Sequence, residues 1–220
     1  PVWLVWFAAG VDWGLSPAPG CITVWGFDAD GRGFRVAETY RTGWDIDRWA
    51  EVAEEYHRTY AIKFFACDPS RNDLIEILNK RLGFGGGRGT PMIAISANNS
   101  LSSRKLGVGQ DFTGIDLMRW ALRSDADGQV RMYWLRGRLD NGADPELMRA
   151  GKPTCSEQEV EGWTYQKQEE GKPIRTKPDE SKPCHGLDSV RYLWNEAWLK
   201  DYLGIQDDGT GGHKPGSYGH

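Results

Sequence analysis

The sequence predicts a single α/β domain in which a mixed sheet of five strands is covered by helices on both faces. Strand-like and amphipathic helical segments alternate along residues 45–139, which is typical of parallel strand–helix units. Before them come three strand-like segments, two of which are joined by the turn sequence DADGRG and so predict an antiparallel hairpin. The chain has 220 residues, of which 39% are hydrophobic and 11 are Trp, and this is enough to bury one core. We expect the domain to cover residues 1–204.

Three strands and one helix are predicted at the start of the chain. The strands cover residues 4–13, 21–28 and 33–41. The segment 45–60 is predicted to be a helix because its apolar residues recur at intervals of three and four, and therefore share one face. These residues are Ile46, Trp49, Val52, Ala53 and Tyr56.

Strands and helices alternate through the middle of the chain. The predicted elements are a strand at 61–68, a helix at 72–83, a strand at 91–96, a helix at 113–124 and a strand at 129–139. Asn72 is expected to cap the start of its helix, and Gly83 is expected to end it.

The last third of the chain predicts a hairpin, a long helix and a tail. Residues 161–177, EGWTYQKQEEGKPIRTK, place two polar arms around EEGK, which predicts an exposed β-hairpin inserted near the functional site. Residues 185–203 predict a strong helix with one apolar face. Residues 205–220 contain no core-forming side chains, and we expect a mobile tail.

Composition limits the classes of function. The formal net charge of −4 gives no overall electrostatic argument for nucleic acid, although an acidic metal site can lie inside a locally basic groove. The four cysteines are scattered without a C-x-x-C pair, which favours a reduced, cytosolic protein over a disulfide or zinc scaffold. No apolar run is long enough to span a membrane. The start PVWLVWF does not have the pattern of a signal peptide, and we expect a fragment of a longer chain.

Three carboxylates occupy comparable positions at the ends of predicted elements. Asp12 ends the first strand, Asp68 ends the strand KFFACD, and Asp188 lies in the first turn of the last helix. Ligands of open α/β sheets gather at the carboxyl ends of strands, so we expect the three to meet there. Clustered carboxylates need a cation to stay ionised, and hard divalent metals prefer oxygen ligands. Two such ions can activate water for phosphodiester cleavage.

Each carboxylate also has a simpler interpretation. Asp12 precedes Trp13-Gly14 and can form an Asx-turn, and Asp68 precedes Pro69-Ser70 and can cap a helix. Asp188 in a first helical turn interacts favourably with the helix dipole. Glu38 is predicted to be an exposed strand residue that is less suited to the site.

Four segments resemble a known family. They are GVDWGLSPAPGCITVWGFDADGRGFRVAETY, FFACDPSRNDLIEIL, SANNS with the later TGIDLMRWAL, and KPCHGLDSVRYLW. Together they resemble, in order, the nuclease domain of tailed-phage terminase large subunits, over residues 5–195. The resemblance implies a ribonuclease-H-like fold and an endonuclease that cuts concatemeric double-stranded viral DNA during genome packaging.

The resemblance also implies a site and a set of partners. Asp12, Asp68 and Asp188 match the family's metal-binding acids, and His185 matches a His three residues before the last acid. Cys184 stands where the family often has an acid, which leaves any auxiliary ligand there in doubt. The implied cofactors are two Mg²⁺ or Mn²⁺ ions. The implied partners are double-stranded DNA, an N-terminal ATPase motor domain, the small terminase subunit and the portal, with no membrane, in the host-cell cytoplasm and outside the mature virion.

Local basic groups are candidates for phosphate contacts, although most such charges are simply solvated. They are Arg104, Lys105, Arg131, Arg136, Arg138, Lys167, Lys172, Arg175, Lys177 and Lys182. His185 lies three residues before Asp188 and therefore on the same side of the helix; its candidate roles are general acid, metal ligand and structural residue.

Two other classes of function remain open. An actin-like or sugar-kinase-like ATPase domain also begins with a strand, an Asp, a Gly and a hairpin, but it needs a second phosphate loop that we do not find. GFGGGRGT lacks the Lys of a P-loop. A non-catalytic binding module is the third possibility, and it predicts no effect of metal.

Overall fold

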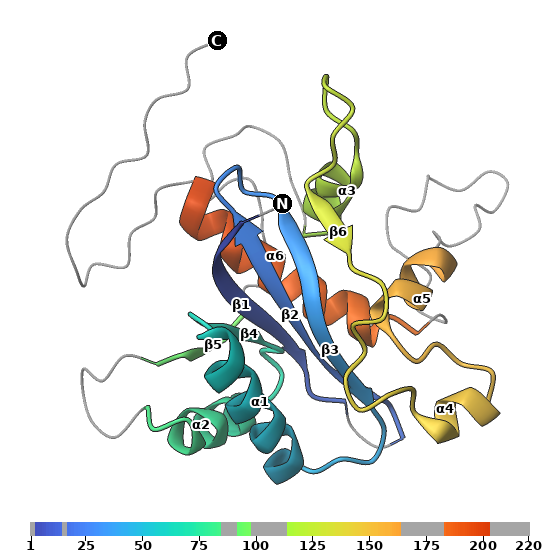
Figure 1. Cartoon of the computed structure of the whole chain (residues 1–220). Coiled ribbons are helices and arrows are strands. Elements are labelled where there is room, and N and C mark those ends of the chain that lie inside the picture. The colour runs from blue at the N-terminus through green and yellow to red at the C-terminus, as the bar shows by residue number, and fades with distance from the viewer. Residues whose placement is uncertain (1–2, 15–16, 85–91, 98–113, 164–182, 203–220) are drawn as a thin grey trace, which may run out of the picture.

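The computed structural model describes residues 3–14, 17–84, 92–97, 114–163 and 183–202, and these form one sheet with helices on both faces (Figure 1). The strands are β1 Leu4–Asp12, β2 Gly20–Asp28, β3 Gly33–Arg41, β4 Phe65–Cys67, β5 Ala94–Ser96 and β6 Met132–Trp134. The helices are α1 Ile46–Tyr60, α2 Asn72–Arg81, α3 Gly114–Leu122, α4 Pro145–Arg149, α5 Ser156–Gly162 and α6 His185–Tyr202. The predicted α/β fold with a mixed sheet is confirmed.

The described sheet has six strands in the order β5-β4-β1-β2-β3-β6, so the predicted number of five is wrong. The first three strands pair antiparallel, while β4 joins β1, β5 joins β4 and β6 joins β3 in parallel. β5 and β6 are three-residue strands at opposite edges of the sheet. Whether such short apolar segments pair depends on the neighbour that each one meets, and local pattern does not encode that neighbour.

The two faces of the sheet bury different cores because side chains alternate along a strand. Ala9 and Val11 of β1 lie in one core with α1 and α2, whereas Ala8 lies in the other with α3 and α6. In Figure 1, α6 crosses behind β1 and β2, while α1 and α2 lie together on the other side. Asp12 and Gly10 share the parity of Ala8 and therefore face α6.

Local capping agrees with one of the two predicted cap residues. Asp45 caps α1, accepting a hydrogen bond from Arg48 N. Asn72 is the first residue of α2 rather than its cap; the cap position is Arg71, which makes no side-chain capping bond. Gly83 does end α2, with φ +80° and with Phe84 N donating to Asn79 O, the six-residue bond of a Schellman motif.

Two helices were not predicted. α4 and α5 are five and seven residues long, too short for a clear helical period. α5 includes residues 161–162, so the proposed hairpin at 161–177 is wrong at its start, and residues 164–177 lie outside the described part of the chain, as does the tail at 205–220. No helix among the described residues is long and apolar enough to cross a bilayer.

α6 packs tightly against β1 at Gly10. A Cβ on Gly10 would lie 1.8 Å from Ser189 O and 3.1 Å from Leu193 Cβ, so no side chain fits there. Beside it, the buried hydroxyls of Thr23 and Ser189 lie 3.1 Å apart and share a hydrogen bond. The absence of a side chain at Gly10 therefore sets how near the first turns of α6 come to β1.

We expect Gly10→Ala to destabilise the protein on the order of 3 kcal/mol, because the added methyl forces α6 away from β1. The measurement is the urea midpoint of unfolding. Gly162→Ala is the matched control, since a Cβ on Gly162 would meet nothing within 4 Å. Equal midpoints for the two variants would contradict this account of α6 packing.

Candidate active site

Two of the predicted carboxylates leave the same edge of the sheet. Asp12 is the last residue of β1, and Asp68 directly follows β4. The two strands are parallel, with Val11 opposite Cys67, and Asp68 N donates to Val11 O at 2.9 Å. The structure therefore brings the backbones of Asp12 and Asp68 side by side, as strand-end reasoning predicted.

Asp12 is a nearly buried carboxylate, 8% exposed, held from two sides. Its Oδ1 accepts a hydrogen bond from Gly14 N at 3.1 Å, so the Asx-turn interpretation is correct as far as it goes. Its Oδ2 lies 3.2 Å from Nδ1 of His185, the first residue of α6. Burial raises the pKa of Asp12 and nearby Asp188 adds to the rise, whereas His185 opposes it.

His185 is paired with Asp12 across 173 positions of sequence. Burial lowers the pKa of His185, but the hydrogen bond to Asp12 and the surrounding negative charge raise it above its ordinary value on balance. The imidazole is half-buried, with 28% of its side chain exposed. The structure thus joins His185 to the first acid.

Asp188 lies in the first turn of α6, as predicted. Its Oδ1 accepts hydrogen bonds from Arg191 Nε at 3.1 Å and Nη2 at 2.8 Å. Its Oδ2 accepts from Cys184 Sγ at 3.2 Å, so the thiol lies against the third acid. Arg191 is a partner of Asp188 that spacing alone did not reveal.

Asp68 is partly exposed and bonds within its own turn. Its Oδ1 accepts from Ser70 N at 2.9 Å, and its Oδ2 accepts from Ser70 Oγ at 2.7 Å. It therefore caps the Pro69-Ser70 turn and not helix α2.

Tyr192 is a buried phenol of α6, 6% exposed. Its pKa is raised first by burial and then by the negative charges of Asp188, Asp68 and Asp12. Tyr192 lies on the apolar face of α6. The sequence did not single it out, because an aromatic residue at an apolar helix position is ordinarily a core residue.

The three acids do not close around one point. Among the described residues, no three His, Cys, Asp or Glu side chains are grouped so that they could hold one ion. Each acid is held by a neighbour of its own, namely His185, Ser70 or Arg191. The donor chemistry still fits a hard divalent cation, because carboxylate oxygens are its preferred ligands and because the buried charge of Asp12 would be relieved by one.

A second buried polar cluster lies beside the site. Glu38 is fully buried, so its predicted exposure is wrong; it pairs with Arg35 and accepts hydrogen bonds from Ser156 N and Oγ, each at 2.6 Å. Glu159 of α5 is 2% exposed and accepts from Tyr40 Oη at 2.6 Å and Leu187 N at 2.9 Å. Burial raises the pKa of Glu159 to about 7.

The basic residues of the proposed DNA surface are only partly placed. Arg136 and Arg138 are exposed on the segment after β6. Arg131 lies with its guanidinium 4.9 Å from the ring of Trp120. The remaining candidates, Arg104, Lys105, Lys167, Lys172, Arg175, Lys177 and Lys182, lie outside the described residues.

Comparison with known proteins identifies the class of fold. No family model matches the chain, and no curated protein matches it. The chain shares its overall fold with a protein domain of known structure. It is similar to the crystal structure of the nuclease domain of g2p, the large terminase of bacteriophage SPP1, with bound Mn. The likeness covers 90% of this chain and 88% of that chain, with a TM-score of 0.52 and 20% sequence identity. It confirms the fold that the sequence resemblance implied.

The ionisation of Glu159 is expected to make stability depend on pH. Its pKa rises from 4.5 in the unfolded chain to about 7 in the folded chain, so the folded chain binds the proton more tightly. The stabilising contribution is complete below pH about 4.5 and is lost as pH rises through about 7. The full difference corresponds to about 3 kcal/mol of unfolding free energy.

This dependence is measured by urea unfolding of the parent and of Glu159→Gln from pH about 4 to pH about 8.5, a range that spans the ordinary and the raised pKa of Glu159. The parent should lose stability relative to the variant as pH rises. A constant difference across this range would show that Glu159 does not titrate there.

Proposed function

We propose that this chain is the nuclease domain of a tailed-phage terminase large subunit and that it hydrolyses phosphodiester bonds of double-stranded DNA with divalent metal ions. The observation that carries the proposal is that Asp12 and Asp68 leave the adjoining ends of parallel strands β1 and β4, while His185, three residues before Asp188, is bonded to Asp12. The likeness to a nuclease domain that binds Mn in its crystal structure supports it.

In the proposed site, Asp12, Asp68 and Asp188 would hold two Mg²⁺ or Mn²⁺ ions. The ions would supply an activated water as nucleophile and stabilise the leaving oxygen. To bind a cation, Asp68 would have to give up its hydrogen bond with Ser70. Asp188 would likewise have to leave Arg191. Arg191 compensates the charge of Asp188, whereas Ser70 only hydrogen-bonds Asp68.

His185 has a separate role in this proposal. Its Nδ1 lies 3.2 Å from Asp12 Oδ2, and as a donor to the ionised carboxylate it would orient Asp12. As a half-buried imidazole with a raised pKa, it can also hold a proton beside Asp12.

The wider setting follows from the same proposal. The substrate is concatemeric viral DNA, which the basic residues Arg104, Lys105, Lys172, Arg175 and Lys182 would contact through phosphates. The N-terminal ATPase motor, the small terminase subunit and the portal are the proposed partners. The proposed location is the host-cell cytoplasm.

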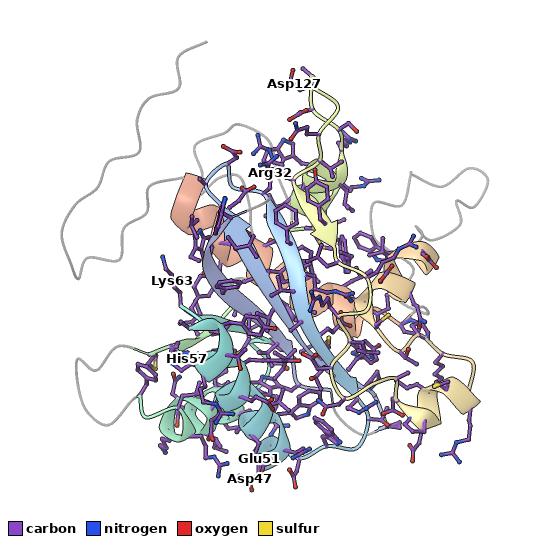
Figure 2. The ribbon with its side chains drawn as sticks, viewed as in Figure 1. Arg32, Asp47, Glu51, His57, Lys63 and Asp127 are labelled. Atoms are coloured by element: carbon purple, nitrogen blue, oxygen red, sulfur yellow. The ribbon has the colours of Figure 1, made fainter. Side chains whose placement is uncertain are left out.

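We expect Asp12→Asn to abolish nicking of supercoiled plasmid in Mg²⁺ or Mn²⁺. The neutral amide keeps the acceptor for Gly14 N but cannot balance divalent charge, so the loss should exceed the about hundredfold cost of altering an outer partner of a metal ligand. Asp127→Asn is the matched control, because Asp127 is exposed at the end of the molecule opposite α1 (Figure 2). Undiminished nicking by Asp12→Asn would refute the proposed site.

We expect ATP to be neither hydrolysed nor bound, because the sequence holds no phosphate loop. The measurement is the thermal midpoint with and without Mg²⁺-ATP, together with phosphate release. A shift at micromolar ATP would favour the actin-like or sugar-kinase-like alternative, whereas no response to metal, ATP or plasmid would favour a non-catalytic binding module.

A further inference from the structure

Glu159 is a buried carboxylate that the proposed mechanism does not use. It lies on α5 with 2% of its surface exposed, and both of its oxygens are engaged. Oε1 accepts the hydroxyl of Tyr40 from the end of β3, at 2.6 Å. Oε2 accepts the backbone N–H of Leu187, in the first turn of α6, at 2.9 Å.

The bond to Leu187 is made at a point of close contact between two helices. A Cβ on Gly186 would lie 2.8 Å from Ser156 Cα and 2.9 Å from Glu159 Oε2, so α6 begins directly against α5. The first N–H groups of a helix have no partner within the helix, and a negative charge there is favourable. Glu159 of α5 therefore caps the first turn of α6, a role that a residue just before α6 would otherwise fill.

α5 is itself anchored to the sheet. Ser156, at its start, donates through both N and Oγ to Glu38 of β3 at 2.6 Å, and Glu38 is paired with Arg35. A continuous series of buried polar contacts thus leads from β3 through α5 to the first turn of α6, which carries His185 and Asp188.

We propose that Glu159 is a positioning residue that fixes the first turn of α6. It thereby keeps His185 within hydrogen-bond distance of Asp12 and holds Asp188 in place on the same turn. Its consequence for cleavage rests on the proposed function, but its effect on α6 does not. The residue touches neither Asp12 nor Asp188 in any contact described above; it acts through the backbone of Leu187.

The test compares Glu159→Met, Glu159→Ala and Glu159→Gln with the parent. Met keeps the length of the side chain but removes the acceptor, Ala removes both, and Gln keeps an acceptor for Leu187 N. Glu157→Met is the matched control, because Glu157 lies on the same helix with 36% of its side chain exposed and faces Arg35 at 3.5 Å. The readouts are amide hydrogen exchange at Leu187, Mn²⁺ affinity, and kcat and KM for plasmid nicking.

For Glu159→Met and Glu159→Ala we expect exchange at Leu187 to accelerate about tenfold, as for a lost buried hydrogen bond. We expect kcat to fall about ten- to a hundredfold with KM nearly unchanged, since a small displacement of reacting groups costs that much. Mn²⁺ affinity should fall with kcat. Glu159→Gln should stay close to the parent, and so should Glu157→Met.

Three outcomes would overturn the inference. They are unchanged exchange at Leu187 in both Glu159→Met and Glu159→Ala, an equal loss of kcat in Glu157→Met, and faster exchange with parent-like kcat and Mn²⁺ affinity. If either the Met or the Ala variant does not fold, the other decides, and Tyr40→Phe, which removes only one donor to Glu159, should give a smaller loss in the same direction. A parent that neither binds Mn²⁺ nor nicks DNA would refute the proposed function, while exchange at Leu187 would still decide the positioning contact.

Discussion

The close approach of α6 to β1 at Gly10 is the constraint on which the site depends. Ser189 O occupies the place where a Cβ on Gly10 would lie. The first turns of α6 can therefore pack directly against the end of β1. This packing brings His185 Nδ1 to 3.2 Å from Asp12 Oδ2. It also places Asp188 where its charge raises the pKa of Asp12. A side chain at Gly10 would separate the helix that carries two of the candidate residues from the strand that carries another.

Charge compensation explains how the acids coexist in the described structure. Asp12 is buried, and burial raises its pKa, yet His185 opposes that rise, while Arg191 pairs with Asp188. Asp68 is more exposed and bonds to Ser70. The two charge-assisted hydrogen bonds of Arg191 to Asp188 are strong, so a cation at Asp188 would have to displace that guanidinium. The buried carboxylates of Glu159 and Glu38 lie beside the site, where they hold α6 and α5 in place through hydrogen bonds.

Residue pattern predicted the parts of the site that lie at the ends of elements. Asp12 and Asp68 follow apolar strands, and Asp188 follows a helix start, so their positions could be read locally. Arg191, Tyr192 and Glu159 could not: the first two look like ordinary helix residues, and the third meets Leu187 only because two distant segments pack together. The same limit explains the mistaken exposure of Glu38, whose partner Ser156 is 118 residues away, and the missed short helices α4 and α5.

The central claim is that Asp12, Asp68 and Asp188 form one site for divalent cations. The most direct measurement is the anomalous difference density of crystals soaked in Mn²⁺. The account predicts strong peaks bounded by Asp12 with Asp68 and by Asp12 with Asp188, and it predicts that Arg191 has left Asp188 in those crystals. Peaks elsewhere on the molecule, or none at saturating Mn²⁺ with Asp188 still paired to Arg191, would contradict it.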